Sequence, residues 1–224
     1  MSYAPTVTTS GGACLAIESR SGQRVHWRKK ICMRAVLFDL GNTLVSYYAA
    51  PEFAPVLRKS LRGCLQILGD PWRGREEEIF QRALILNVER ADYSVWPLMQ
   101  RLTALFGPGL PDSETQDALV TAFMEPIFAT AVVDPEALST LASLRADGLV
   151  SNTPWGSPAP PWRDELAHHG LLTAVDAVVF CVDVGYRKPH RAPFARASRV
   201  FRLPGVLRRC GPGFLRSFAE AWAG

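Results

Sequence analysis

The sequence lacks several features that would place it at once in a broad class. No apolar run approaches the roughly 18 residues of a membrane-spanning helix, so we expect no transmembrane segment. The five cysteines are scattered and include no Cys-x-x-Cys pair, which argues against a zinc site and a disulfide framework. The N-terminus lacks the apolar core of a signal peptide. These absences favour a cytoplasmic protein.

Lysine is also scarce, with four residues among 224. The net charge of +4 arises from basic residues near the two ends of the chain. Residues 1–33 and 184–224 are strongly basic, whereas residues 34–183 are net acidic. A nucleic-acid-binding domain would carry its basic patch on the folded body. We therefore expect a small-molecule substrate, with neither nucleic acid nor membrane as a partner. No feature of the sequence predicts an oligomeric state.

The apolar pattern predicts an α/β protein. Three short runs are typical of buried parallel strands: 35–39, 149–150 and 177–182. Six segments have helical periodicity: 54–68, 76–92, 95–106, 113–128, 135–146 and 161–169. The alternation of strands and helices predicts a doubly wound, Rossmann-like core with a parallel sheet.

The helical segments between the first two strands are too long for a single crossover connection. We expect residues 48–130 to form an inserted all-helical lobe, and residues 33–47 and 131–200 to form the α/β core. Residues 1–32 show no sustained period, and they fit either a disordered leader or sequence upstream of a true start at Met33.

The most informative segment is Arg34–Ser46, which links the first predicted strand to a tight turn. It brings one carboxylate, Asp39, to the end of the strand, followed by Gly41, Asn42 and Thr43. In open α/β sheets, ligands bind beyond the carboxyl ends of the strands. Asp39 is therefore a candidate nucleophile, because a carboxylate can form a covalent intermediate.

Two further polar residues follow the other predicted strands. Ser151 closes the second strand, and Lys188 lies just beyond the third, in the segment Val184–Pro189. With Asp39, Ser151 and Lys188 in this order, the chain resembles the haloacid dehalogenase (HAD) superfamily of hydrolases. The resemblance covers about residues 33–199 and includes a helical cap between the first two motifs.

The resemblance implies a role for each of these residues. Asp39 matches the nucleophile that takes a phosphoryl group as an aspartyl phosphate. Ser151 matches the hydroxyl that binds a phosphoryl oxygen, and Lys188 matches the ammonium that offsets negative charge. The polar neighbours are expected to shape the turn or contact the phosphate: Asn42, Thr43 and Asn152. Asp183 also follows the third strand, where we expect a turn role.

The resemblance also implies Mg²⁺, with Asp39 and the backbone carbonyl of Gly41 as ligands. Phosphatases of the family have a general-acid aspartate where this chain has Gly41. They also have metal-binding aspartates after a further strand, whereas no aspartate follows Asp183 here. The remaining metal ligands are therefore missing from this sequence, and we expect the C-terminal part of the core to be incomplete.

Residues 201–224 form an atypical basic tail without a strand pattern. The tail is rich in Arg, Gly and Pro, and we interpret it as the product of a lost reading frame. The leading hypothesis is a phosphatase-type hydrolase of a small phosphorylated metabolite, acting through Asp39. One alternative is a dehalogenase-like hydrolase that uses Asp39 on carbon without metal. The other is a catalytically inactive or truncated protein with the HAD fold.

Overall fold

The computed structural model describes residues 36–70, 72–108, 110, 112–144 and 148–200. The interpretations of residues 1–32 and 201–224 concern parts of the chain outside these ranges. None of the described helices is long and apolar enough to cross a membrane.

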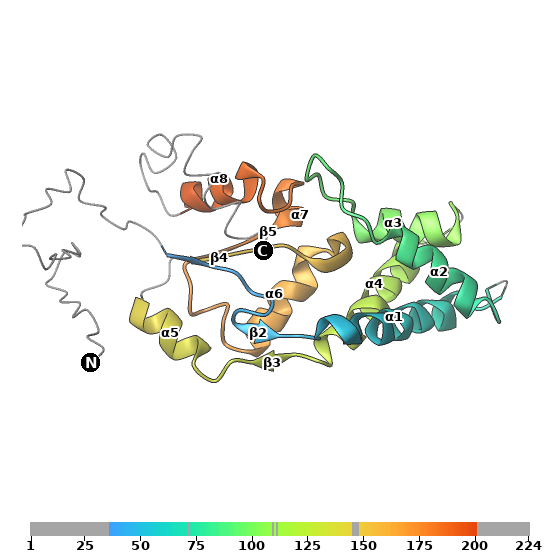
Figure 1. Cartoon of the computed structure of the whole chain (residues 1–224), viewed down its shortest axis with the longest axis horizontal. Coiled ribbons are helices and arrows are strands. Elements are labelled where there is room, and N and C mark those ends of the chain that lie inside the picture. The colour runs from blue at the N-terminus through green and yellow to red at the C-terminus, as the bar shows by residue number, and fades with distance from the viewer. Residues whose placement is uncertain (1–35, 71, 109, 111, 145–147, 201–224) are drawn as a thin grey trace, which may run out of the picture.

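Four helices form a helical region at one end of the molecule (Figure 1). They are α1 (Phe53–Leu68), α2 (Glu76–Leu86), α3 (Leu98–Phe106) and α4 (Ser113–Phe128), and a short 3-10 turn, η1 (Ala50–Glu52), precedes α1. The Asp112 carboxylate accepts a hydrogen bond from the Thr115 amide at 3.0 Å, which caps the start of α4. α1 and α4 pack together along their apolar faces, with Leu61 and Leu119 fully buried.

The α/β core is built on a three-stranded parallel sheet with the order β1-β4-β5. Its strands are β1 (Leu37–Phe38), β4 (Gly148–Ser151) and β5 (Ala177–Phe180). The helices of the core are α5 (Ala137–Leu144), α6 (Ala159–His168), α7 (Cys181–Val184) and α8 (Arg191–Val200), and the 3-10 turn η2 (Pro154–Gly156) leads into α6.

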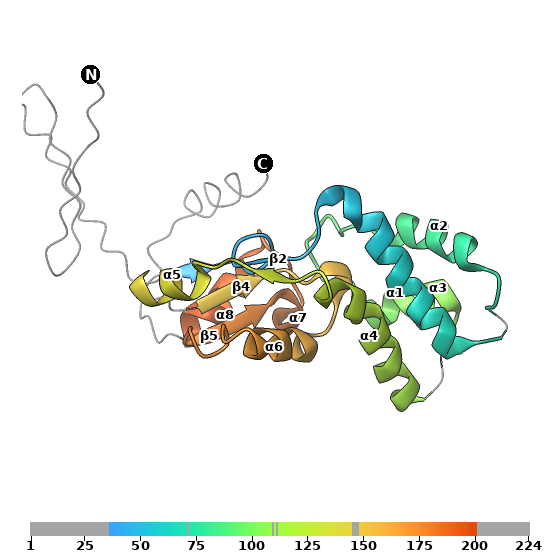
Figure 2. The same cartoon turned by 90° about the horizontal axis from the view of Figure 1, so that it is seen from below.

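Successive residues of the strands face helices on opposite sides of the sheet. Val150 and Val179 pack with Ala197 of α8 in one apolar cluster. Leu149 and Phe180 belong to a second, larger cluster that also contains residues of α6 and of the helical region. Figure 2 shows α6 and α8 beside the strands. The predicted doubly wound α/β fold is therefore confirmed within the described residues.

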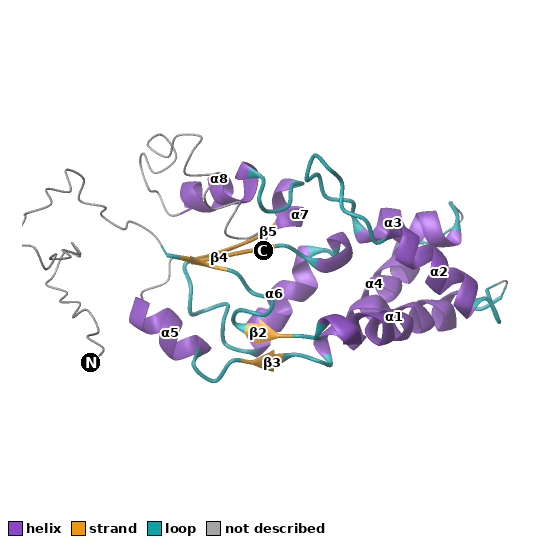
Figure 3. Cartoon of the chain, viewed as in Figure 1, coloured by secondary structure: helices purple, strands orange, loops and turns teal. Residues whose placement is uncertain are grey.

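Several elements differ from the sequence prediction, as Figure 3 shows by secondary structure. The third strand ends at Phe180, and Cys181–Val184 form a helical turn because the Asp183 carboxylate accepts a hydrogen bond from the Phe180 amide at 2.8 Å. Helix α8 was not predicted. A two-stranded antiparallel sheet, β2 (Val45–Ser46) with β3 (Val132–Val133), was also missed, and it joins the segments on either side of the helical region.

The segment between α2 and α3 is the largest departure from the predicted helices. Residues 87–97 form an irregular loop, which we call the α2–α3 loop, instead of continuing the helices predicted at 76–92 and 95–106. Its backbone pairs with the core, since the Val95 amide donates to the Gly185 carbonyl at 2.9 Å. Long-range pairing has replaced the local helical pattern there.

Candidate active site

Asp39 and Lys188 form an ion pair at the carboxyl end of the parallel sheet. The Lys188 Nζ lies 2.8 Å from the Asp39 Oδ1, and their side chains are 10% and 16% exposed. The ammonium also donates to the Val150 carbonyl at 2.9 Å, and the Leu40 amide donates to Asp39 Oδ1 at 2.8 Å. Burial lowers the pKa of Lys188, and the nearby Asp39 carboxylate opposes this shift. The sequence-predicted nucleophile and cation are thus in direct contact.

Asn152 holds the backbone of Lys188 through both ends of its side-chain amide. The Lys188 amide donates to Asn152 Oδ1 at 2.7 Å, and Asn152 Nδ2 donates to the Lys188 carbonyl at 3.3 Å. The sequence placed Asn152 among the phosphate contacts. In the structure this side chain fixes the loop that carries the lysine, while the residue also borders the cavity described below.

The turn after β1 brings its polar residues to different places. Asn42 has a positive φ of 56°, which asparagine tolerates better than most residues, and its amide donates to the Val45 carbonyl at 2.8 Å. Asn42 and Gly41 line the cavity. Thr43 is exposed and is not among the residues that line it.

Ser151 is the last residue of β4 and is almost fully buried, with 5% of its surface exposed. Its hydroxyl donates to the Asn152 carbonyl at 3.3 Å, which is a long hydrogen bond. The hydroxyl could therefore donate to a ligand oxygen instead. Parallel pairing places Ser151 opposite Phe180 in the next strand. Ser151, unlike Asp39 and Lys188, is itself a lining residue of the cavity.

A cavity of about 260 Å³ opens beside these residues. Leu40 and Gly41, which directly follow Asp39, form part of its border. The other lining residues are of two kinds. The apolar and aromatic ones are Tyr47, Tyr48, Ile127, Pro154, Trp162 and Phe180. The polar ones are Asn42, Ser151, Asn152, Thr153 and Arg187. The lining contains a cation, Arg187, and no carboxylate among the described residues, which favours an anionic ligand.

Sequence reasoning missed Arg187 and the two tyrosines of this cavity. Arg187 directly precedes Lys188, so its place beside the strand ends could have been inferred from the motif. Tyr47 and Tyr48 gave no such signal, because they follow β2 and their rings pack against residues distant from the motifs, Trp162 of α6 and Phe53 of α1. The Tyr47 ring meets the Trp162 ring edge-on, with centroids 5.4 Å apart.

The described residues do not complete a Mg²⁺ site. They contain no group of three or more His, Cys, Asp or Glu side chains placed to hold a metal. Asp39 is already paired with Lys188. Asp183 is engaged as expected of a turn residue, since it accepts hydrogen bonds from the Phe180 amide and from Arg163, both at 2.8 Å. One carboxylate and the Gly41 carbonyl fall short of the oxygen-rich shell that Mg²⁺ prefers.

Comparison with known proteins gives structural similarities and no sequence match. No protein-family model matches the chain, and no curated protein matches it. A HAD phosphatase from Thermococcus onnurineus is similar in structure, with 22% identity, a TM-score of 0.49, and coverage of 78% of this chain and 74% of that chain.

Two further similar structures represent different members of the superfamily. The HAD hydrolase YfnB from Bacillus subtilis, bound to magnesium, is 17% identical, with a TM-score of 0.40 and coverage of 76% and 72%. The L-2-haloacid dehalogenase from Xanthobacter autotrophicus is 23% identical, with a TM-score of 0.41 and coverage of 77% and 66%. Because all three TM-scores are below 0.5, a function has to be argued from the residues of this chain.

Proposed function

We propose that this chain is a hydrolase of small anionic molecules in which Asp39 acts as a covalent nucleophile. The observation that carries the proposal is the contact of 2.8 Å between Lys188 and Asp39 at the carboxyl edge of the sheet. A carboxylate can act as a covalent nucleophile, and an ammonium at this distance can offset the negative charge that the nucleophile and an anionic substrate bring together. Ser151 lies at the end of the adjacent strand and opens to the cavity.

The first substrate class is a phosphate monoester. An Asp39 oxygen attacks phosphorus as the bond to the ester oxygen breaks, and the leaving alcohol takes its proton from solvent. Water then attacks the aspartyl phosphate, which releases inorganic phosphate and restores the carboxylate. Ser151 donates a hydrogen bond to a phosphoryl oxygen, and Lys188 offsets the charge that nucleophile and phosphoryl group bring together.

Gly41 and the incomplete metal shell favour a second candidate, displacement of halide from carbon. Gly41 offers no side chain that could protonate a leaving alcohol, a contribution typically worth roughly 10²–10⁴-fold in rate. A halide needs no proton when it leaves. In this reaction Asp39 attacks the carbon that carries the halogen, the carbon–halogen bond breaks, and water cleaves the resulting ester to give the hydroxy compound.

One set of assays tests the shared mechanism and separates the two substrate classes. We expect the purified chain to hydrolyse 4-nitrophenyl phosphate or 2-chloropropionate, each assayed with Mg²⁺ and with chelator. Asp39→Asn should abolish turnover of the active substrate, whereas Asp117→Asn, at an exposed position of α4, should leave it unchanged. Phosphate release that requires Mg²⁺ supports the first class, and chloride release that is insensitive to chelator supports the second.

The covalent step has a direct readout. Rapid acid quenching during turnover should leave the substrate-derived group on the peptide that contains Asp39, as detected by mass spectrometry. Turnover that persists in Asp39→Asn, or a covalent adduct on another residue, would refute the proposed nucleophile.

A further inference from the structure

The α2–α3 loop of the helical region pairs its backbone with the core segment that directly precedes Lys188. An isolated antiparallel bridge joins Ser94 of the loop to Tyr186 of the core. Two backbone hydrogen bonds flank the bridge: the Val95 amide donates to the Gly185 carbonyl at 2.9 Å, and the Arg187 amide donates to the Tyr93 carbonyl at 2.8 Å. Figure 1 shows the loop reaching from the helical region towards α7. The pairing therefore fixes the core backbone up to the residue before Lys188.

An ion pair ties the same loop to the side chain of that residue. The Glu89 Oε1 lies 2.8 Å from the Arg187 Nη1, and the two side chains are 46% and 19% exposed. The same nitrogen donates to the Thr153 carbonyl at 3.5 Å, in the segment that follows β4. The loop therefore holds Arg187 both at its backbone and at its guanidinium.

The loop is itself anchored at both ends by Arg101 of α3, whose side chain is 1% exposed. The Arg101 Nη1 and Nη2 donate to the Leu86 and Val88 carbonyls, where α2 passes into the loop. The Arg101 Nε donates to the Trp96 carbonyl near the other end. Burying a guanidinium is costly unless its donors are satisfied, so any movement of these carbonyls is opposed. The loop thus has the fixed backbone that a positioning element needs.

Lys188 depends on a fixed backbone to keep its ammonium beside Asp39. Its Nζ lies 2.8 Å from the Asp39 Oδ1 and donates to the Val150 carbonyl at 2.9 Å. Because a lysine side chain is a flexible four-carbon stem, a small shift of its backbone can move the ammonium out of this contact. Asn152 holds the Lys188 amide and carbonyl from within the core. The α2–α3 loop holds the preceding residue from the helical region.

The loop has no direct place in the cavity. Among the described residues that line the cavity, none belongs to residues 87–97. We therefore expect any effect of the loop on the reaction to pass through the core segment with which it pairs.

We propose that the α2–α3 loop is a positioning element for Lys188, with Glu89 as a positioning residue that acts through Arg187. The loop keeps residues 185–187 in place, and this placement keeps the ammonium in contact with Asp39. The consequence for turnover rests on the proposed function, in which the ammonium offsets negative charge at Asp39. The helical region thereby controls a contact between two residues of the core.

Chemical labelling of lysine tests this placement without a substrate. The chain has four lysines, of which the structure describes Lys59 and Lys188. Acetic anhydride acylates an accessible, uncharged amine, so Lys188, which is 10% exposed and paired, should be labelled through local opening. Lys59, at an exposed position of α1, gives a reference rate in the same molecules. Site-resolved mass spectrometry measures both rates.

Two variants loosen the loop in different ways. Glu89→Gln removes the charge that pairs with Arg187 and leaves the backbone bridge intact. It should raise the labelling rate of Lys188 by about 2–5-fold, the factor that corresponds to a partly exposed ion pair. Val95→Pro removes a backbone donor of the bridge and should raise the rate by about 10-fold, as for a lost backbone hydrogen bond. The rate at Lys59 should stay the same in both variants.

Matched controls separate positioning from a general loss of stability. Glu89→Asp keeps the charge and should remove part of the increase at Lys188, and Glu114→Gln, at an exposed position of α4, should leave the wild-type rate unchanged. Cys64, which is fully buried in α1, should react with iodoacetamide no faster in Glu89→Gln than in wild type. Equal acceleration at Cys64 and Lys188, or an unchanged Lys188 rate in folded Glu89→Gln, would overturn the proposal.

Kinetic measurements distinguish this inference from the proposed reaction. With a substrate that the wild type turns over, Glu89→Gln should lower kcat by about 2–5-fold and change KM by less than about twofold, because the loop does not line the cavity. A change in KM alone would assign the loop to substrate binding and refute the positioning role. If the labelling rates change as expected but wild type turns over neither 4-nitrophenyl phosphate nor 2-chloropropionate, the positioning role stands and the proposed function fails. Turnover in wild type with unchanged labelling in Glu89→Gln and Val95→Pro would leave the hydrolase and refute the positioning role.

Discussion

The helical region and the α/β core achieve stability in different ways. In the helical region, apolar side chains fill the interface between α1 and α4, and charges pair on the outside, as Arg58 does with Glu77 at 2.6 Å. Two polar side chains are also fully buried there, Ser60 of α1 and Arg101 of α3. In the core, polar groups are buried at the end of β4 and along the segment that leads to α6: Ser151, Thr153 and Ser157 are all nearly inaccessible, and an ion pair lies near the end of β4.

The core also contains backbone conformations and buried polar groups that lower the free energy of unfolding. Asn42 and Trp155 both have positive φ, and residues held in such regions cost on the order of 1–3 kcal/mol each. The Tyr47 hydroxyl and the Trp155 indole nitrogen are buried without a hydrogen-bond partner in the described structure. The Ser60 hydroxyl of α1 is likewise buried without a partner in the described structure, and Tyr93 of the α2–α3 loop also has positive φ. The other three residues lie at the cavity or next to a residue that lines it, as expected where a site is maintained at the expense of stability.

The comparison predicts that a packing defect in the helical region lowers stability without changing chemistry. Leu119→Ala should reduce the free energy of unfolding by about 2–5 kcal/mol, because Leu119 is fully buried between α1 and α4. Denaturant unfolding followed by circular dichroism measures the change. The turnover number per folded molecule should stay the same at a temperature where the variant remains folded.

Ser151→Ala is the matched change in the core. Its hydroxyl makes only a long hydrogen bond, so the loss in stability should be at most about 1 kcal/mol. The rate should fall by about 10²-fold or more if Ser151 stabilises charge in the transition state. A large loss of stability in Ser151→Ala, or a loss of turnover in folded Leu119→Ala, would break the division between the two regions.

The contact between the two regions can be tested at Gly156. A Cβ added there would clash with the Trp96 carbonyl of the α2–α3 loop, whereas at Gly170 no atom lies within 4 Å of the added Cβ. Both glycines have positive φ, so both alanine variants carry the backbone cost of about 1–2 kcal/mol. Overpacking should add about 1–3 kcal/mol for Gly156→Ala alone.

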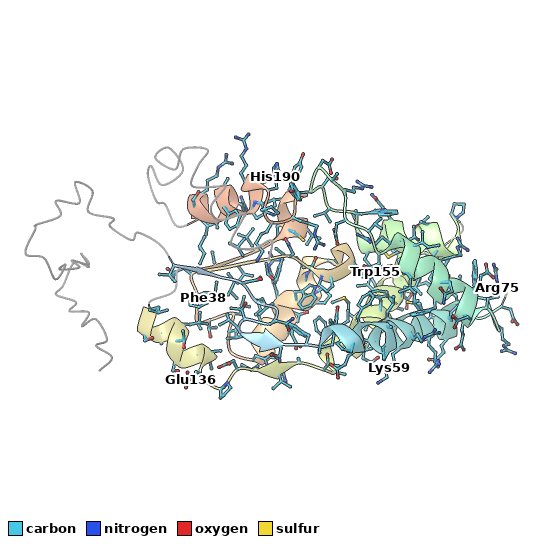
Figure 4. All side chains as sticks on the ribbon, viewed as in Figure 1. Phe38, Lys59, Arg75, Glu136, Trp155 and His190 are labelled. Carbon is cyan, nitrogen blue, oxygen red and sulfur yellow. The ribbon has the colours of Figure 1, made fainter. Side chains whose placement is uncertain are left out.

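The readout is the difference between these two variants in thermal or denaturant unfolding. Trp155, next to Gly156, lies where the core meets the helical region, with its ring centroid 5.4 Å from that of Phe123 (Figure 4). Equal destabilisation by the two substitutions would mean that the regions separate easily at this contact.

Much of the fold could be predicted because its signals are local. The runs at β1, β4 and β5 are apolar and short, and the helices at 53–68 and 113–128 have clear periodicity and caps or breaks at their ends. The number of helical residues between the first two strands led us to expect a helical lobe inserted in the core. The end of β5 at Phe180 was missed because a side-chain cap from Asp183 overrides the β propensity of the following residues.

The site could be predicted only where residues belong to strand ends. Asp39 directly follows β1 and Ser151 ends β4, so the parallel pairing of these strands brings both to one edge of the sheet, whereas Lys188 lies on a loop beyond β5. The double hydrogen bond of Asn152 to the Lys188 backbone and the ion pair between Glu89 and Arg187 join residues far apart in the chain. Neither follows from a local pattern, since each depends on how a loop of one element lies against another.

The two lysines of the described structure predict a contrast in pH dependence. Burial lowers the pKa of Lys188, so we expect the alkaline limb of kcat/KM to lie below about 10.4, the ordinary lysine value. Between the folded and the unfolded pKa, the unfolded chain binds more protons, so the contribution of Lys188 to stability rises with pH while activity falls.

Lys188→Arg should move the alkaline limb of any residual activity to higher pH, because the guanidinium stays charged. Lys59→Arg, at an exposed position of α1 (Figure 4), should leave the limb in place. Activity that rises through this pH range in wild type would contradict a charged role for Lys188. The measurement is kcat/KM from about pH 7 to about pH 11 at constant ionic strength, a window that includes the ordinary lysine value of about 10.4 and extends well below it.

The smallest change is expected at Cys64, which should not react with iodoacetamide in the native protein. This thiol is fully buried between α1 and α4 and donates to the Leu119 carbonyl at 3.6 Å. Burial raises its pKa to about 12, so at pH 8 only about 10⁻⁴ of it is thiolate, the form that reacts.

Cys181 is equally buried, but it contacts Thr153 at the edge of the cavity. We therefore expect iodoacetamide to label Cys181 through local opening of the site, and Cys64 only on global unfolding. Site-resolved mass spectrometry of the native chain measures both rates, and Leu119→Ala should accelerate the labelling of Cys64 alone. Faster labelling of Cys64 than of Cys181 in wild type would show that the helical region, not the core, is the less stable part.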